Sequence, residues 1–492
     1  MADFGFVGTS YTAPSIYQDD QECINFFAEI DPVKQQGERG IVALYPTPGL
    51  TLQTQLTQAE VRGLHTMSGE TLMIAVAGNI VYKVDLAMVA TQIGTLTTSS
   101  GQVVISDNIT NADGLIAYIV DGPNRYTWVV GTNTFSTLPS SDGPWQGASV
   151  VDVIDNYNIY NEPDTQNWAC TDLGSRLSTQ ALYGTSDGSS DLLVTLIADR
   201  RQVYLMGETT TEVWTDVGNV IAGITTFPFQ RVPGTFSQTG CGAKYSLARF
   251  ADSFVIVAKD TRGNSTIEMM QGYAWVKIST HAVEQSLLNQ VVSDAVAYTY
   301  QIQGHEMYVC TFPSVGEYGL TWVYDLSTKS WHKWLSWDSS SAVYKRHRSN
   351  CGAYFANMYI VGDYENGKLY SLENEVYTDD GATIRRLRRA KHLTTDLQRQ
   401  YFEEFQIQFQ PGVGLNDGQG QDPQAMLRWS NDGGSTFSNE HWVTIGKIGQ
   451  YLNRAIWRRL GWSRDRIFEV VITDPIKAVV VSANLKASAG DN

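Results

Sequence analysis

The chain has 492 residues, of which 42% are hydrophobic and 17% are charged, and its formal net charge is −16. This length exceeds what one small core can organise, and the apolar content excludes a disordered chain. Aromatic residues make up 11%, and glycine supplies 43 residues, a composition typical of short strands joined by tight turns and not of a helical bundle.

Neither a membrane segment, a signal peptide nor a cofactor motif is evident in the sequence. Apolar runs such as Leu72–Ala77 are far shorter than the roughly 20 residues that span a bilayer. The N-terminus lacks a basic segment followed by an apolar run, so we expect a soluble chain made in a cytoplasm. The five cysteines are widely spaced and form no C-x-x-C pair, which predicts reduced, buried thiols without zinc or disulfides. No phosphate-binding glycine motif opens a helix, so no nucleotide cofactor is expected.

Strand and turn patterns follow one another along most of the chain. The run Leu72–Ala77 ends at Gly78-Asn79 and resumes at Ile80, which predicts a hairpin. Similar units, each an apolar strand, a Gly/Asp/Asn turn and an aromatic strand, follow at intervals of about 40 to 50 residues, the period of propeller blades. These patterns predict an all-β fold, a β-propeller of short antiparallel blades. A row of β-sandwich domains is the alternative.

The composition of the sequence changes near residue 380, after a single predicted helix. Residues 281–290 form the clearest helical run, with Ser279 and Thr280 as candidate caps. After Gly381 come a basic run, an alternating aromatic strand and a Gly/Asp/Gln-rich stretch, 412–424, that is typical of an exposed loop. We therefore expect a propeller-like body over 1–380 and a C-terminal β-sandwich-like domain over 381–492.

Charge is divided unevenly between these two parts. Residues 381–492 hold 15 basic and 11 acidic residues, a net charge of +4, whereas the rest of the chain holds 20 basic and 40 acidic residues, a net charge of −20. An acidic body cannot hold nucleic acid by neutralising phosphates. We therefore interpret the basic C-terminal segments as contacts with an acidic partner or another copy of the chain, with phosphate contact as the alternative. The candidate contact residues are Arg385, Arg386, Arg388, Arg389, Arg458, Arg459 and Arg464.

Several short motifs resemble catalytic or sugar-binding sites. Residues 184–188 spell G-x-S-x-G, but a strand follows where a nucleophile elbow needs a helix. Residues 430–437 resemble the Asp box of sialidases, with Phe437 in place of tryptophan, and this motif builds a turn. Asp152 and Asp155 could be a pair of catalytic acids, yet the alternation around them predicts a hairpin with Asp155-Asn156 at its turn. We assign all three motifs structural roles, and we expect the dispersed histidines to be strand or surface residues.

Taken in order, several segments resemble the packaged-DNA stabilisation proteins, the tail hub or nozzle proteins, of short-tailed phages. They include Gln21-Glu22-Cys23-Ile24-Asn25-Phe26-Phe27-Ala28-Glu29, Leu44-Tyr45-Pro46-Thr47-Pro48-Gly49-Leu50, Gly207-Glu208-Thr209-Thr210-Thr211-Glu212-Val213-Trp214, Ile278-Ser279-Thr280-His281-Ala282-Val283-Glu284 and Trp457-Arg458-Arg459-Leu460-Gly461. The resemblance spans nearly the whole chain.

This resemblance implies a non-enzymatic structural protein of the virion tail that is assembled in the host cytoplasm. It implies a homohexameric ring below the portal–adaptor complex that closes the DNA exit channel after packaging and anchors the tail needle, fibres or spikes. Genomic DNA would pass through the channel without sequence-specific binding, and neither catalytic residues nor cofactors are implied. A sialidase-like propeller glycosidase and a carbohydrate-binding virion protein are the alternatives, suggested by the Asp box and the many aromatic residues.

Overall fold

A computed structural model gives the fold of the chain. It describes residues 2–3, 5–11, 15, 20–31, 42–218, 220–221, 224–259 and 264–490. Nearly all elements are β-strands, as the composition predicts. The described residues form seven propeller blades and a sandwich of two layers, one of which is continuous with the sheet of the sixth blade.

The blades are built from antiparallel strand pairs, and the strand order follows the chain in all but the fifth and the seventh blade. The first blade consists of β6 (Val61–Thr66), β7 (Leu72–Ala77), β8 (Ile80–Asp85) and β9 (Ala90–Thr95). The second consists of β10 (Val104–Thr110), β11 (Gly114–Val120), β12 (Arg125–Val129) and β13 (Thr134–Thr137). The third consists of β14 (Val151–Ile154), β15 (Tyr157–Asn161), β16 (Asn167–Cys170) and β17 (Tyr183–Thr185). The fourth blade consists of β18 (Leu193–Asp199), β19 (Gln202–Gly207), β20 (Thr211–Asp216) and β23 (Phe229–Arg231). The fifth consists of β24 (Gly240–Cys241), β25 (Ala248–Phe250), β26 (Ser253–Lys259), β27 (Ser265–Gln271) and β28 (Ala274–Lys277).

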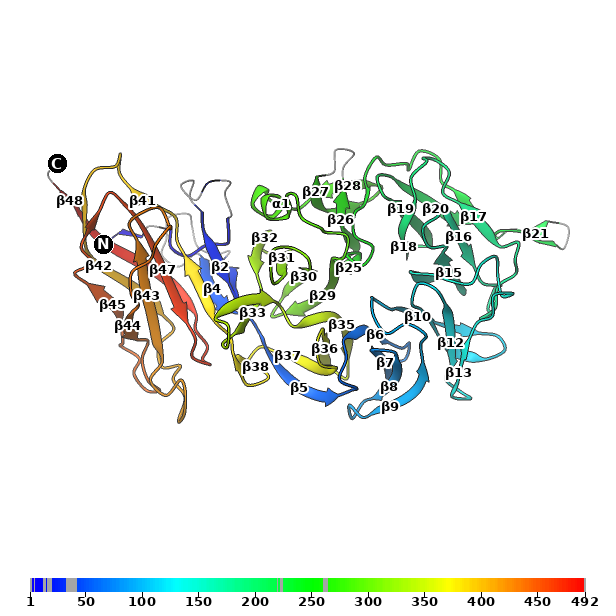
Figure 1. Ribbon diagram of the computed structural model, residues 1–492, viewed down its shortest axis with the longest axis horizontal. Helices are drawn as coiled ribbons and strands as arrows, with labels where there is room; N and C mark the ends of the chain where they lie inside the picture. The colour runs from blue at the N-terminus through cyan, green and yellow to red at the C-terminus, as the bar shows by residue number, and fades with distance from the viewer. Residues whose placement is uncertain are drawn as a thin grey trace.

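The sixth sheet consists of β29 (Val296–Ile302), β30 (His305–Phe312), β31 (Leu320–Asp325) and β32 (Ser330–Lys333), and the seventh of β35 (Ser349–Phe355), β36 (Met358–Asp363), β37 (Lys368–Glu373) and β5 (Gly49–Gln55). Figure 1 shows the sheets around a common centre, with β6, β10, β18, β25, β29 and β35 nearest to it. Strand β5 comes from the N-terminal part of the chain and pairs with β37, with Glu373 opposite Gly49. The ring is therefore closed by a strand that lies about 300 residues from its neighbours in sequence.

The middle strands of the blades are buried on both faces because each blade packs between two neighbours. In β7 the last five residues are all buried, and in β11 the same holds for Ile116 to Val120. One buried cluster joins the first two blades and contains Ile74, Val76 and Trp128. Such strands appear in the sequence as continuous apolar runs and not as alternating ones.

Tight turns occur where the sequence predicts them. Asp155 and Asn156 have φ angles of 44° and 65° and connect β14 to β15, as a two-residue hairpin turn requires. Gly78, with a φ angle of 55°, and Asn79 connect β7 to β8 in another two-residue turn. The predicted helix is α1 (His281–Leu287). Its N-cap residue Thr280 makes no side-chain cap hydrogen bond, and Ser279 Oγ donates instead to Glu284, so neither predicted cap acts as one.

Two further sheets form a β-sandwich beside the propeller (Figure 1). The first contains β1 (Ala2–Asp3), β3 (Phe26–Ile30), β4 (Val42–Pro46), β42 (Gln400–Phe409), β45 (Ala455–Arg458), β46 (Trp462–Ser463) and β48 (Val480–Ala489). The second contains β2 (Glu22–Ile24), β40 (Arg386–Arg389), β41 (Leu393–Thr394), β43 (Gln424–Ser430), β44 (His441–Thr444) and β47 (Asp465–Ile472). Separate short pairs are β21 (Val220–Ile221) with β22 (Ile224–Thr225) and β33 (Leu335–Asp338) with β34 (Val343–Arg346). The short strands β38 (Thr378–Asp379) and β39 (Ala382–Thr383) extend the sheet of the seventh blade, where β38 pairs in parallel with β5.

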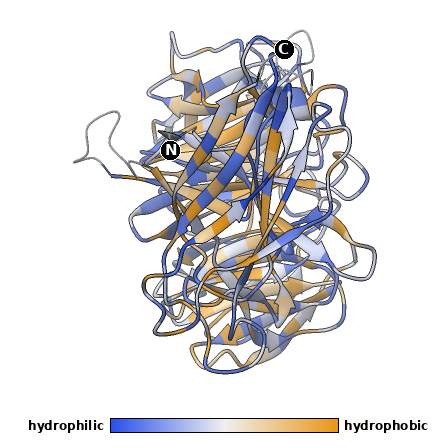
Figure 2. Ribbon diagram, turned by 90° about the vertical axis from the view of Figure 1, so that its left-hand side faces the viewer, coloured by the Kyte–Doolittle hydropathy of each residue, from blue (hydrophilic) through white to orange (hydrophobic). Residues whose placement is uncertain are grey.

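The sandwich core lies between its two sheets. Phe405 is fully buried and stacks on Phe468 and Trp457, with ring centroids 4.9 and 5.7 Å apart. Hydrophobic and hydrophilic residues alternate along the sandwich strands, as Figure 2 shows, because one face of each sheet is buried. The loop over residues 410–423 contains no strand and is largely exposed, as predicted.

N-terminal strands complete the sandwich and connect it to the propeller. Strand β4 pairs with β48 through Leu44 and Val480, and β2 pairs with β40. On its other side β2 pairs in parallel with β32 of the sixth blade, through Ile24 and Lys333. The sheet of the sixth blade thus continues into the sandwich. The domain boundary near residue 380 stays a prediction, and the sandwich sheets also include strands from residues 2–46.

Candidate interaction surfaces

Two of the seven candidate contact arginines are buried inside the sandwich. Arg386 and Arg388 lie on β40, and their side chains are 0% and 1% exposed. The Arg386 guanidinium donates to the carbonyls of Asp474 and Tyr377, and that of Arg388 donates to Phe6, Thr9 and the Gln21 side chain. Burial lowers the pKa of each to about 10, so both stay charged at neutral pH. These two side chains fix the N-terminal segment and the loops around it, and they do not reach the surface.

Arg389 and Arg385 lie at the junction of the sandwich and the propeller. Arg389 pairs with the fully buried Glu469, with 2.8 Å between Nη2 and Oε2, and Arg428 pairs with the other oxygen of the same carboxylate. Both guanidinium groups lie over the ring of Phe437. Arg385 is half-buried and lies over the indole of Trp337, 4.7 Å from the ring centroid.

The second basic segment presents its arginines to solvent. The side chain of Arg458 is 63% exposed and pairs with Glu404, at 3.1 Å. Arg459 is exposed, and Arg464 is exposed and donates to the carbonyl of Leu397. A contact of any of the seven arginines with a partner stays a prediction. The structure places Arg458, Arg459 and Arg464 where such a contact is sterically open.

The Asp-box-like segment forms a turn between β43 and β44. Ser430 Oγ donates to Asp432 and accepts from the amide of Gly434. Asp432 also accepts from the amide and the hydroxyl of Thr436. These hydrogen bonds lower the pKa of Asp432 to about 2. The carboxylate is occupied in holding its own turn, as the motif predicts.

The other catalytic-looking motifs also have structural partners. Ser186 is buried after β17, and the next element is the strand β18, so the strand–turn–helix geometry of a nucleophile elbow is not formed. Asp152 accepts from the amide of Ala198 and from Arg249, at 2.8 and 2.9 Å. Asp155 pairs with Arg201. The two aspartates thus belong to separate interactions with neighbouring strands.

Histidines and cysteines are mostly buried in the propeller and the sandwich. His305 is 5% exposed on its side chain and contacts Asp325 with Nδ1 at 2.8 Å and Glu29 with Nε2, which raises its pKa to about 9. Burial lowers the pKa of His332 to about 4. His392 contacts Asp465 at 2.8 Å. All five cysteines are free thiols, of which four are buried and Cys351 is half-buried. The described residues contain no group of side chains suited to hold a metal ion.

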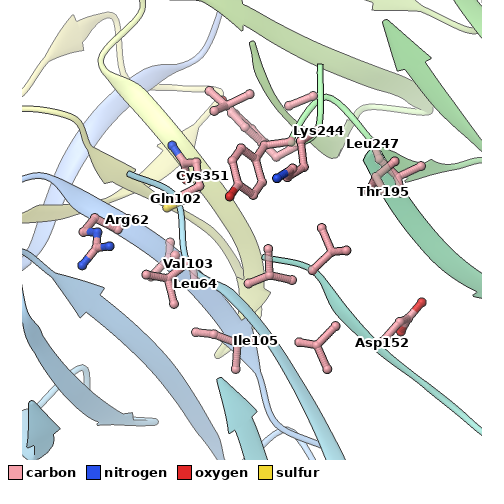
Figure 3. A pocket seen from close by; sticks show the side chains of 18 of the residues that line it. Arg62, Leu64, Gln102, Val103, Ile105, Asp152, Thr195, Lys244, Leu247 and Cys351 are labelled. Carbon is pink, nitrogen blue, oxygen red and sulfur yellow. The ribbon is translucent and has the colours of Figure 1, made fainter. Parts of the chain in front are cut away.

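A cavity of about 290 Å³ lies near the propeller centre, between the first strands of several blades (Figure 3). Figure 3 shows Arg62 and Asp152 on opposite sides of it. Arg62 is fully buried and donates to the carbonyls of Gly78, Thr98 and Ser100. Lys244 also lines the cavity, and burial lowers its pKa. The Arg62 guanidinium and the Asp152 carboxylate are therefore engaged in bonds that hold loops and blades together.

Comparison with protein families identifies the chain. A model described as bacteriophage P22 Gp10, beta-propeller, matches residues 16–377, and one described as bacteriophage P22 Gp10, beta-sandwich, matches residues 385–488. The chain belongs to the P22 Gp10 family. It is therefore a structural phage protein of the tail hub family that the sequence segments resemble, and the propeller and sandwich predictions are confirmed.

Two further comparisons add little to the family assignment. No curated protein matches the chain. Among solved structures, a chain from "Crystal Structure of Mitotic Checkpoint Complex" is similar at 11% identity and a TM-score of 0.39, over 70% of this chain and 95% of that one. Within the part of the chain that the structure describes, no helix is both long and apolar enough to cross a bilayer.

Proposed function

We propose that the chain is the tail hub, or nozzle, subunit of a short-tailed phage and works by assembly and not by catalysis. Six copies form a ring below the portal–adaptor complex, close the DNA exit channel after packaging, anchor needle, fibre or spike proteins, and pass the genome during ejection. The observation that carries this proposal is the family match over both the propeller and the sandwich.

The distribution of charge supports the role as a conduit. A channel for a polyanion needs walls that do not retain phosphates, because each bound phosphate would slow translocation. The acidic residues concentrate in 1–380, with a net charge of −20, and the C-terminal part carries +4. In a ring, each subunit presents one patch to a different patch on the next, and oppositely charged surfaces suit such a contact. We propose Arg458, Arg459 and Arg464 for this contact, since they are on the surface.

We also propose that 1–380 and 381–492 act as a body and a C-terminal unit in assembly. Strand β2 of the body pairs with β40 of the C-terminal unit on one side and with β32 of the sixth blade on the other, so one continuous sheet joins the two units. A force on the sandwich is therefore transmitted to the sixth blade through backbone hydrogen bonds.

Negative-stain imaging of the purified chain, mixed with the portal–adaptor complex of the same particle, tests the proposal. We expect a ring of six subunits with an axial hole. Reversing the charge at two proposed contacts, Arg458→Glu with Arg464→Glu, should reduce ring formation. The matched control Arg200→Glu, on a propeller side chain that is 67% exposed, should leave it intact. A chain that stays monomeric and ignores the adaptor complex would contradict the proposal.

A further inference from the structure

A groove of about 470 Å³ lies between the sandwich and the sixth blade. Residues of β32, β2, β40 and β43, which belong to one continuous sheet, line it together with residues of the β33–β34 pair. Its size lies within the range of sites that accept a few side chains. The lining residues that matter here are Ile24, Leu335, Trp337, Tyr344, Arg385 and Leu387.

The cations that line the groove are balanced by carboxylates, except for one. Lys333 pairs with Glu22 at 2.8 Å. Arg389 and Arg428 share Glu469, and Arg389 also lies 4.0 Å from Asp20. Arg385 forms no ion pair with a carboxylate of the described residues. Among those residues, the groove thus contains one positive charge without a carboxylate partner, in a chain whose net charge is −16.

The surroundings of Arg385 hold its guanidinium in a partly desolvated position. Its Nε atom is buried and has no hydrogen-bond partner among the described residues. The plane of the group lies over Trp337, whose ring packs edge-on against Tyr344 at 4.9 Å. The backbone carbonyl of Arg385 is held by the side-chain amide of Asn25 at 2.9 Å. The side chain is therefore positioned by its neighbours but keeps donors available.

We infer that this groove binds a short acidic segment of a partner protein, with a carboxylate on Arg385 and an adjacent apolar side chain against Leu335 and Trp337. A carboxylate matches the fork of guanidinium donors on the half-buried Arg385 side chain. An aliphatic or aromatic side chain next to that carboxylate in the peptide matches the apolar surface of Leu335 and Trp337. The unpaired positive charge of Arg385 favours an acidic segment over a basic one. The apolar and cationic side chains that line the groove together suit a peptide with both apolar and acidic residues. This inference concerns a separate surface and does not depend on ring formation.

Fluorescence polarisation of the full-length chain with a labelled peptide of alternating Glu and Leu tests the inference. The comparison peptides replace every Glu by Gln or by Lys. We expect saturable binding of the acidic peptide alone, and binding that weakens as salt is added. Arg385→Gln should weaken it about tenfold or more, as expected for loss of a hydrogen bond between charged groups. Arg385→Lys should restore part of the affinity. The matched control Arg200→Gln removes a propeller arginine whose side chain is 67% exposed and lies outside the groove, and it should have no effect.

Three results would overturn the inference. One is equal binding of the acidic peptide to the wild type and Arg385→Gln, with both melting at the same temperature. Another is no preference among the three peptides. The third is self-association of the chain in sedimentation velocity, if it disappears in Arg385→Gln and if the acidic peptide inhibits it. The groove would then bind a second copy of the chain. Unchanged sedimentation together with peptide binding supports a different protein as the partner.

Discussion

Glu469 provides the sharpest stability prediction, because one fully buried carboxylate neutralises two arginines. Replacing it by glutamine keeps the shape of the side chain and removes the negative charge between Arg389 and Arg428. Removing one partner from a buried ion pair costs about 3–5 kcal/mol. The two arginine side chains are 24% and 29% exposed and can regain some water, so we expect a loss near the lower limit, about 3 kcal/mol.

The matched control is Glu404→Gln on the neighbouring sandwich sheet. Glu404 pairs with Arg458, whose side chain is 63% exposed, and pairs of this kind contribute less than about 1 kcal/mol. Urea unfolding followed by tryptophan fluorescence measures both variants, and Trp429 on β43 reports on the sandwich. If Glu469→Gln lowers the free energy of unfolding no more than Glu404→Gln does, the buried carboxylate does not stabilise the two arginine charges.

Three further predictions concern the propeller and the thiols. Gly367→Ala should lower the melting temperature, because φ is +71° there and a Cβ would collide with the Thr57 carbonyl. Gly381→Ala, at φ +81° in open space, should lower the melting temperature less. Equal shifts in the two variants would show that the close approach of Thr57 does not restrict residue 367. His305 has a raised pKa of about 9, so its stabilising charge is fully present below about pH 6.5 and is lost as the pH rises through about 9; melting curves should show this loss in the wild type and not in His305→Gln. An aromatic disulfide reagent should label the four buried cysteines only after denaturation, and rapid labelling of the native chain would disprove their burial.

Local signals in the sequence predict much of the propeller. The Asp155-Asn156 and Gly78-Asn79 turns need only two residues with suitable backbone preferences, and flanking β-rich runs make the hairpins recognisable. The helix at His281 is predicted for the same reason, since its pattern is local. Its end is not, because residues 288–290 turn away after Leu287.

Contacts between distant segments could not be predicted. The number of blades depends on β5 pairing with β37, and nothing near either strand specifies the other. Strand β2 likewise joins β32 and β40, which lie more than 300 residues away. Pairing of this kind is decided by the packing of the whole fold and not by local propensity.

The environment of the candidate contact arginines could likewise not be predicted from the sequence around them. A cluster of arginines indicates a surface, and this expectation fits the exposed Arg459 and Arg464. Arg386 and Arg388 are buried because carbonyls from distant segments accept their hydrogen bonds. Glu469, which neutralises Arg389, also lies 80 residues away. The sequence shows the charges but not these partners.

The number of subunits in the complex with the portal–adaptor assembly tests the proposed function most directly. Native mass spectrometry of that complex should give six copies of the chain, and images of it should show an axial hole. A complex that contains a single copy, or no copy at all, would contradict the role of the chain as a ring-forming tail hub.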